Sequence, residues 1–311
     1  MDDKQITLLA GGVGGAKLVY GFANNESFPP SNVIVNTGDD FSYYGLKISP
    51  DIDSVLYALA NISHPTHGFG RYDDTYTVFD TLSEIGERPW FRLGDKDLAL
   101  NLIRTQRINS GEPLSEVTLE ISKLLDVTYP IYPMTDGRIQ TKIETSQYGT
   151  LDFQEYFVKY QFKPAIKQVF YSNIENATLC GTARIALEKS KQVVICPSNP
   201  WLSIFPILSI QGVKEILQSK RVLAVSPIIG QNAVKGPTAK IFREFGITPS
   251  ALEVAKLYEG FINQMVIDKE NADEKNAIED LGIETIVTDI IMADKENKIR
   301  LAKEILCFME K

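Results

Sequence analysis

The sequence predicts an α/β protein with a Rossmann-like, doubly wound and mainly parallel sheet. Short apolar runs alternate with amphipathic helical patterns towards both ends of the chain. Glycine-rich or polar segments follow several of these runs, as they do where ligands bind in such sheets. The stretch between the two α/β parts has the patterns of helices followed by antiparallel β-hairpins. We therefore expect a single α/β domain over residues 1–311, with residues about 61–165 as an inserted subdomain.

The first α/β part is expected at residues 1–60. Residues 6–10 form a short apolar run that stops at glycines, typical of a buried parallel strand, and residues 16–23 continue as a helix. Residues 32–38 predict a second strand. Ser49 and Pro50 have the residue types of an N-cap and a first helical position. The helix they begin has one apolar face, made of Ile52, Val55, Leu56 and Leu59.

The middle and the C-terminal part differ in pattern. Residues 75–128 are mostly helical, whereas residues 129–158 are divided by proline and glycine into short alternating stretches that predict antiparallel hairpins. After about residue 165 the α/β alternation returns and ends in a helix around residues 299–309. The strands expected there are residues 168–171, 192–196, 222–226, 264–268 and 284–288.

Composition limits the partners and the location that we expect. The net charge of −8 and the pI near 5.0 argue against nucleic acid or an anionic membrane as a bulk partner. Cys180, Cys196 and Cys307 are far apart and predict reduced thiols. With neither a secretory signal pattern nor an apolar run of transmembrane length, the expected location is cytoplasmic. The sequence is compatible with a homodimer.

A glycine-rich segment between the first strand and helix predicts a phosphate site. Its candidate residues are Gly11, Gly12, Gly14, Gly15 and Lys17. Glycines let the backbone approach a ligand, and helix N-termini direct unpaired N–H groups at anions. The segment lacks the third glycine of a dinucleotide fingerprint. It also lacks the glycine and the Ser/Thr that flank the lysine of a Walker A loop. The alternative is a tight turn for strand–helix packing.

Acidic residues follow the second strand and open the next helix. Asp39 and Asp40 come after a predicted strand end, and Asp51 and Asp53 lie in the first turn of the helix. Carboxylates suit Mg²⁺, which usually takes one or two of them together with substrate phosphates. Asp39, Asp40 and Asp51 are the candidate metal ligands. Helix capping is the alternative, and it explains Asp51 better than Asp53.

Three further segments carry polar side chains. Ser198 and Asn199 lie between two prolines directly after an apolar strand. Lys235 and Lys240 follow another strand, and lysine can serve as a point-charge phosphate ligand. The segment at residues 92–97, with its alternating charges around a glycine, is typical of a solvated turn. His64 and His67 lie in a predicted loop, and no GxSxG elbow presents a serine, so nucleophilic catalysis has little support.

In this order, the motifs resemble the 2-phospho-L-lactate transferase family of coenzyme F-420 biosynthesis. The matching stretches are LAGGVGGAKL, VNTGDDFSYYGLKISPDIDSVLYAL, WFRLGDKDLALNLIRTQ, PMTDGRIQTKIET, LDFQEYFV, ICPSNPWLSIFPIL and VSPIIGQNAVKGP. They extend from residue 8 to residue 237. The last seventy residues add little recognisable motif.

The resemblance implies a Mg²⁺-dependent transfer without a covalent enzyme intermediate. The acceptor would be Fo, the deazaflavin 7,8-didemethyl-8-hydroxy-5-deazariboflavin, through its terminal ribityl hydroxyl. The donor would be a guanosine diphosphate ester of a three-carbon acid, such as lactyl-2-diphospho-5′-guanosine, with GMP as leaving group. Such chemistry relies mainly on positioning and charge neutralisation.

The resemblance also assigns residues. Asp53 and Arg92 match positions implicated in Fo binding, while the 11–17 loop and the 198–200 turn match nucleotide-side positions. The loop has the form GVGGAK, where archaeal members tend to have GTGTPK. The donor acid therefore stays open between phospholactate, phosphoenolpyruvate and phosphoglycerate. Archaeal members can carry Glu at the position of Asp39.

Two other functions compete with this interpretation. One is a regulator of the gluconeogenesis-factor family, which binds nucleotide sugars and has a similar glycine-rich start. The other is a Rossmann dehydrogenase, against which the missing third glycine argues. The acceptor-side segments SPDIDSVLY and LGDKD favour the transferase.

Overall fold

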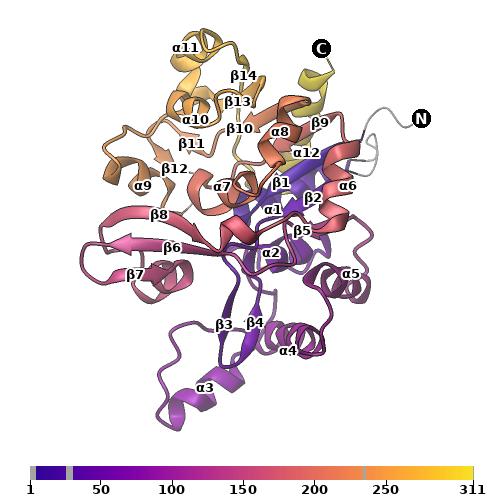
Figure 1. The fold of residues 1–311 in the computed structure, drawn as a ribbon, viewed down its shortest axis with the longest axis vertical. Coiled ribbons are helices and arrows are strands. Elements are labelled where there is room, and N and C mark those ends of the chain that lie inside the picture. The colour runs from indigo at the N-terminus through magenta and orange to yellow at the C-terminus, as the bar shows by residue number, and fades with distance from the viewer. Residues whose placement is uncertain (1–4, 26–30, 234–235, 311) are drawn as a thin grey trace.

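The computed structural model describes residues 5–25, 31–233 and 236–310. Within these residues a seven-stranded parallel sheet has the order β14-β13-β10-β9-β1-β2-β5 (Figure 1). Its strands are β1 (Ile6–Ala10), β2 (Asn32–Val35), β5 (Ile131–Pro133), β9 (Gln192–Ile195), β10 (Arg221–Val225), β13 (Gln264–Asp268) and β14 (Glu284–Thr288). The chain builds outward from β1 to β5, returns to β9, and then builds outward on the other side. This order confirms the predicted doubly wound fold.

Helices cover both faces of the sheet, so its strands are buried on both sides. Leu8 and Leu9 of β1 are both inaccessible to solvent, and they belong to different apolar clusters. The cluster on the Leu8 side includes residues of α1 (Gly12–Ala23), α2 (Pro50–Leu59), α5 (Leu114–Leu124) and α12 (Lys295–Met309). Such two-sided burial explains why the strands have continuous apolar sequences.

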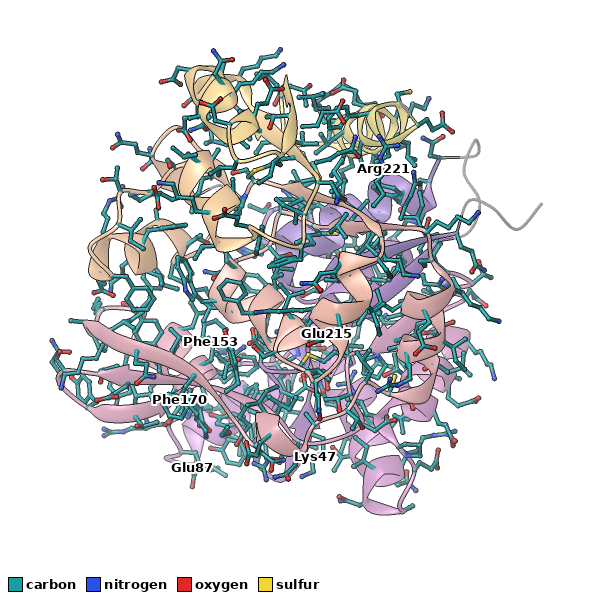
Figure 2. The ribbon with its side chains drawn as sticks, turned by 45° about the horizontal axis from the view of Figure 1, so that its top comes forward. Lys47, Glu87, Phe153, Phe170, Glu215 and Arg221 are labelled. Atoms are coloured by element: carbon teal, nitrogen blue, oxygen red, sulfur yellow. The ribbon has the colours of Figure 1, made fainter. Side chains whose placement is uncertain are left out.

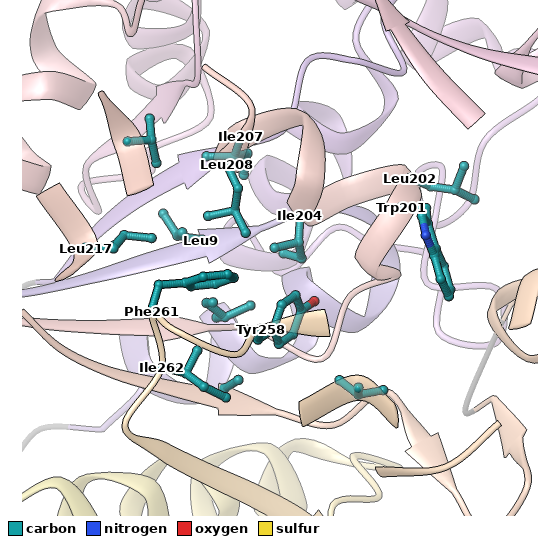
Figure 3. Packing of buried hydrophobic residues seen from close by; sticks show 14 of the residues in the cluster. Leu9, Trp201, Leu202, Ile204, Ile207, Leu208, Leu217, Tyr258, Phe261 and Ile262 are labelled. Atoms are coloured by element: carbon teal, nitrogen blue, oxygen red, sulfur yellow. The ribbon is translucent and has the colours of Figure 1, made fainter. Parts of the chain in front are cut away.

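The Leu9 side carries the larger cluster, part of which Figure 3 shows around Ile204, Ile207 and Tyr258. It draws on α6 (Gly181–Lys189), η3 (Pro200–Ile204), α7 (Phe205–Leu208), α8 (Val213–Gln218), α9 (Thr238–Glu244), α10 (Ala251–Leu257) and α11 (Lys275–Glu279). The short turn η4 (Lys269–Glu274) follows β13. Among the described residues, no helix is long and apolar enough to cross a membrane.

A projecting part follows β2. The strands β3 (Phe41–Tyr43) and β4 (Leu46–Ile48) form an antiparallel hairpin, and α3 (Thr77–Glu84) and α4 (Asp95–Asn109) lie beside it. Phe41 and Phe79 belong to a small apolar cluster there. Glu87 lies at the lower edge of the molecule in Figure 2 and accepts a hydrogen bond of 3.2 Å from Tyr44.

A three-stranded antiparallel sheet of order β7-β6-β8 lies against the body of the molecule. It consists of β6 (Gln140–Thr145), β7 (Gly149–Asp152) and β8 (Ile166–Ser172), with η1 (Glu155–Lys159) and η2 (Ile174–Asn176) nearby. A two-residue hairpin, β11 (Ile228–Ile229) and β12 (Asn232–Ala233), follows β10.

Two strands differ from the sequence-based expectation. The expected strand at residues 168–171 does form, as part of β8, but it pairs antiparallel with β6 instead of joining the central sheet. Conversely, β5 lies within the stretch expected to form hairpins, yet it pairs parallel with β2 and ends the central sheet. An edge position tolerates Pro133, which has no N–H to donate.

Candidate active site

A pocket of about 440 Å³ opens beside the carboxyl ends of β1, β2 and β9. The strand order reverses between β1 and β9, and ligands in open α/β sheets bind at such a point. The predicted site residues that line this pocket are Gly11, Gly12, Gly14, Lys17, Asp39, Asp51, Asp53, Arg92, Ser198 and Asn199. The fold therefore brings residues predicted for the nucleotide side and residues predicted for the acceptor side to one cavity.

The glycine loop runs directly from β1 into α1. Gly11 is the extended N-cap residue of α1 and provides no side-chain cap, while Gly12 has a positive φ of 61°. A Cβ on Gly11 would lie 2.6 Å from Oδ2 of Asp51, and one on Gly14 would lie 2.4 Å from the carbonyl oxygen of Pro197. Close packing thus accounts for Gly11 and Gly14, and backbone conformation accounts for Gly12.

Gly15 and Lys17 differ in their surroundings. Gly15 is buried against Ser198 and Ala10 and is not part of the pocket wall. Lys17 does line the pocket, one turn into α1. Partial burial lowers the pKa of Lys17. A positive charge that is incompletely hydrated in the apoprotein suits an incoming phosphate.

The turn after β9 holds the glycine loop in place. The hydroxyl of Ser198 donates to the carbonyl oxygen of Gly11 at 2.7 Å and accepts from its N–H at 3.3 Å. Asn199 Oδ1 accepts from the N–H groups of Trp201 and Leu202, while its Nδ2 donates to Thr238 Oγ1. Both side chains therefore already have structural partners at the pocket wall.

Asp51 is fixed beneath the glycine loop. Asn36 Nδ2 donates to Asp51 Oδ2 at 2.9 Å, and the N–H of Gly12 also bonds this carboxylate. Burial raises the pKa of Asp51 to about 6. Burial, followed by the charge of Asp51, raises the pKa of Asp39 well above its usual range. The two carboxylates are thus close enough to repel each other.

A cation would relieve this repulsion. Oδ1 of Asp39 is buried and has no hydrogen-bond partner in the described part of the chain, and the same holds for Oδ1 of Asp40. Within the described residues, no group of three or more His, Cys, Asp or Glu side chains is arranged to hold a metal. The donor set fits an ion that takes its other ligands from phosphate and water, as Mg²⁺ commonly does.

Asp40 lies apart from the main pocket. It contributes instead to a small cavity beside β6, and its Oδ2 accepts a hydrogen bond of 2.7 Å from Ser49. Burial raises the pKa of Asp40 well above its usual range, and the charges of Asp53 and Asp51 act in the same direction.

The two residues predicted to bind the acceptor, Asp53 and Arg92, reach the pocket from different elements. Asp53 is in the first turn of α2 and forms a buried ion pair with Arg104. Arg92 precedes α4, pairs with Asp80 of α3, and lies 5.1 Å from the ring centroid of Tyr76. Arg92 is therefore held by an exposed pair, whereas Asp53 is held from inside the protein.

Of the two predicted phosphate lysines, the structure describes only Lys240. Lys240 does not line the pocket, and its ammonium group donates to Glu244 Oε1 at 2.5 Å and to the carbonyl oxygen of Pro164 at 3.0 Å. Pairing with Glu244, four residues further along α9, turns the Lys240 side chain away from the pocket. Lys240 therefore does not lie with the other predicted phosphate residues. Lys235 lies outside the described residues.

The family model of 2-phospho-L-lactate transferase CofD matches residues 6–304. The chain belongs to this family. It is 38% identical over 309 residues to the 2-phospho-L-lactate transferase of Methanocaldococcus jannaschii, with 97% of each chain covered. It is also 38% identical over 308 residues to that of Methanopyrus kandleri, with 98% of each covered.

Among solved structures, the transferase-family fold is shared by a Bacillus halodurans protein of the UPF0052 family. Two crystal structures of that protein superpose with TM-scores of 0.67 and 0.64, covering 98% of this chain and 99% of the other. Identity in both comparisons is 18%, so this likeness concerns the fold.

The pocket of this transferase-family chain also contains residues that sequence reasoning missed. Tyr57 donates a hydrogen bond to Asp97, and both line the wall beside Asp53. His64 and His67, expected as loop residues, line the pocket with their rings stacked at 4.4 Å. Tyr57 could have been predicted from the sequence, because it lies four residues after Asp53 on α2 and therefore on the same face of that helix. No sequence pattern indicated that the two histidines line the pocket.

Proposed function

We propose that the protein transfers a phospho-three-carbon-acid group from a guanosine diphosphate ester to the terminal ribityl hydroxyl of the deazaflavin Fo. The hydroxyl oxygen forms a bond to the phosphorus that carries the acid. The bond from that phosphorus to the oxygen bridging the two phosphates breaks, GMP leaves with the electron pair, and the hydroxyl proton is released.

The observation that supports this proposal most directly is the shared pocket. The glycine loop and Lys17 lie at the strand-order reversal, where a diphosphate is expected, and Asp53 and Arg92 line the same cavity. At about 440 Å³ the cavity has the size of an ordinary small-molecule site. Membership of a transferase family makes group transfer the reaction to expect there.

The residues of the chain divide into two roles in this proposal. On the donor side, N–H groups at the start of α1 and the Lys17 ammonium neutralise phosphate charge. On the acceptor side, Asp53 accepts hydrogen bonds from ribityl hydroxyls and orients the nucleophile. Asp39 and Asp51 would hold Mg²⁺, which would supply positive charge against the negative charge that develops on the leaving group.

Product analysis tests the proposal. The protein is incubated with Fo, Mg²⁺ and one of three guanylated acids, those of phospholactate, phosphoenolpyruvate and phosphoglycerate. The products of each reaction are identified by mass spectrometry. We expect one donor to yield GMP and an equal amount of Fo enlarged by the phospho-acid group. Asp53→Asn should slow this transfer by about a hundredfold or more, while the exposed Asp280→Asn should not.

The competing function gives a different outcome. A regulator of the gluconeogenesis-factor type would transfer nothing from any of the three donors and would bind nucleotide sugars in calorimetry. That pair of results would replace the transferase proposal. Full turnover by Asp53→Asn would leave the reaction in place and remove Asp53 from the acceptor side.

A further inference from the structure

A buried guanidinium group holds Asp53 from behind the pocket wall. Arg104 of α4 is 1% exposed, and its Nη1 donates to Asp53 Oδ2 at 3.0 Å while its Nη2 donates to Asp53 Oδ1. The pair is therefore bidentate, with both carboxylate oxygens engaged by one planar group. This geometry fixes the orientation of a carboxylate as well as its charge.

Arg104 is itself held by its own helix. Its Nη1 also donates to Asn101 Oδ1 at 2.6 Å, and Asn101 Nδ2 donates to the carbonyl oxygen of Asp97 at 3.0 Å. Asn101 is completely buried. A chain of hydrogen bonds thus connects the backbone at the start of α4 to the carboxylate of Asp53 on α2.

The charges around Arg104 are mostly negative. Burial alone would lower the pKa of Arg104, but the charge and hydrogen bonds of Asp53, followed by Tyr57 and Asp40, outweigh it and raise the pKa. Asp97 also faces Arg104. Among the described residues, Arg104 is the one buried lysine or arginine. Without it, several carboxylates would face one another out of water, which is costly.

We infer that Arg104 is a positioning residue of the acceptor side. It does not line the pocket, so it acts through Asp53. By occupying one pair of lone-pair directions on the Asp53 oxygens, it leaves the remaining lone pairs free to accept hydrogen bonds from acceptor hydroxyls. This inference rests on the proposed function, in which Asp53 binds the deazaflavin.

A purely structural ion pair would behave differently from a positioning residue. Loss of such a pair lowers the stability of the whole fold, and any fall in the folded fraction weakens the apparent binding of every ligand by the same factor. Loss of a positioning residue for Asp53 weakens the acceptor selectively, because the nucleotide side is built from β1, α1 and the turn after β9. The ratio between the two effects therefore distinguishes the roles.

The test compares variants on one helix. Arg104→Lys keeps the charge but loses the planar fork, and Arg104→Met loses both. Arg107→Met is the matched control, since Arg107 is partly exposed and pairs with Glu112 at the other end of α4. For each variant, the KM for Fo is measured by product formation, and the Kd for GDP is measured by calorimetry.

We expect Arg104→Lys to raise the KM for Fo by at least about tenfold, the change that corresponds to about 1.4 kcal/mol. The Kd for GDP should stay within about twofold, and Arg107→Met should change neither value. Arg104→Met should raise the KM further. If it does not fold, Arg104→Gln takes its place, because it also loses the charge and the fork but can still donate a hydrogen bond to Asp53, and it should raise the KM likewise.

The double variant decides whether Arg104 acts through Asp53. In an Asp53→Asn background, Arg104→Lys should raise the KM for Fo no further, because the carboxylate that it orients is already gone. Equal losses for Fo and GDP, an unchanged KM, or a full additional loss in the Asp53→Asn background would each overturn the inference.

Failure of the proposed function gives a separate result. If the wild-type protein neither binds Fo in equilibrium dialysis nor converts it, both the function and the inference fall. If the wild-type protein converts Fo and only the Arg104 variants behave against expectation, the function stands and the inference alone is overturned.

Discussion

At the residue scale, Gly14 shows how closely the glycine loop is packed. A Cβ there would lie 2.4 Å from the carbonyl oxygen of Pro197, a backbone atom that cannot rotate away. Gly14→Ala should therefore destabilise the protein by about 1–3 kcal/mol. At Gly181, the first residue of α6, nothing lies within 4 Å of a Cβ, so Gly181→Ala should be neutral or slightly stabilising.

Urea denaturation at equilibrium measures both glycine variants. Equal midpoints for Gly14→Ala and Gly181→Ala would contradict the packing argument. A larger side chain at Gly14 would displace the Pro197 backbone whether or not a ligand is bound. Nucleotide binding by a variant such as Gly14→Val therefore reports packing together with phosphate contact, and Lys17→Met is the cleaner probe of the phosphate site.

Asp97 gives stability a pH dependence. Burial, helped by the charge of Asp53, raises the pKa of Asp97 to about 7, against about 3.9 in an unfolded chain. The folded protein therefore binds more protons between these values. The stability that Asp97 contributes is complete below about pH 4 and is lost as the pH rises through about 7.

Asp97→Asn should remove this pH dependence, because an amide does not titrate and its oxygen can still accept the Tyr57 hydrogen bond. Between pH 5 and pH 8 we expect the wild-type protein to lose about 2–3 kcal/mol relative to the variant. Urea unfolding at the two pH values measures the difference. Parallel pH profiles for the two proteins would refute the assignment.

At the element scale, the starts of α3 and α4 are bound to each other by two carboxylates, Asp74 and Asp95. Asp74 accepts hydrogen bonds from the N–H groups of Lys96 and Asp97 in the first turn of α4. Asp95 accepts from the N–H groups of Thr77 and Val78 at the start of α3. The LGDKD segment, which resembles a solvated turn in sequence, thus takes part in a reciprocal exchange in which carboxylates accept from the first N–H groups of both helices.

Asp95→Ala should loosen α3, of which only Phe79 is buried. Hydrogen exchange of the α3 amides should become faster, while the α12 amides serve as an unchanged internal reference. Because Arg92 is paired with Asp80 on α3, the KM for Fo should rise as well. Asp73→Asn is the control, since the Asp73 side chain makes only a 3.8 Å pair with Lys96 and Asn tolerates the positive φ at this position. Identical exchange in both variants would count against this role of Asp95.

At the scale of the whole molecule, metal and nucleotide binding should be linked. Asp39 and Asp51 supply at most a partial coordination sphere, so Mg²⁺ alone should leave the melting temperature unchanged. GDP should raise it, and GDP with Mg²⁺ should raise it further. A ligand at a hundred times its Kd stabilises a protein by about 2.7 kcal/mol.

Thermal unfolding with and without EDTA measures this linkage. Asp39→Asn should reduce the additional increase due to Mg²⁺ without reducing the increase due to GDP, and Asp280→Asn should change neither. A large increase with Mg²⁺ in the absence of nucleotide would show a preformed metal site and contradict the expectation.

Several features of this protein follow from local sequence. Continuous apolar runs predicted the buried strands β1, β9, β10 and β13, because a strand covered on both faces cannot expose polar side chains. Glycines and polar residues directly after β1, β2 and β9 predicted the edge of the sheet where the pocket lies. The family motifs predicted the family.

Tertiary structure decided what depends on distant pairing. The parallel edge strand β5 has three residues and ends in a proline, so its sequence carries no periodic signal. The strand β8 has the apolar run of residues 169–171 in its sequence, but only its antiparallel register with β6 shows which sheet it joins. Arg104 is 51 residues from Asp53, and its pattern is that of any helical arginine. Its burial against Asp53 arises from the packing of α4 on the body of the protein, which no local pattern encodes.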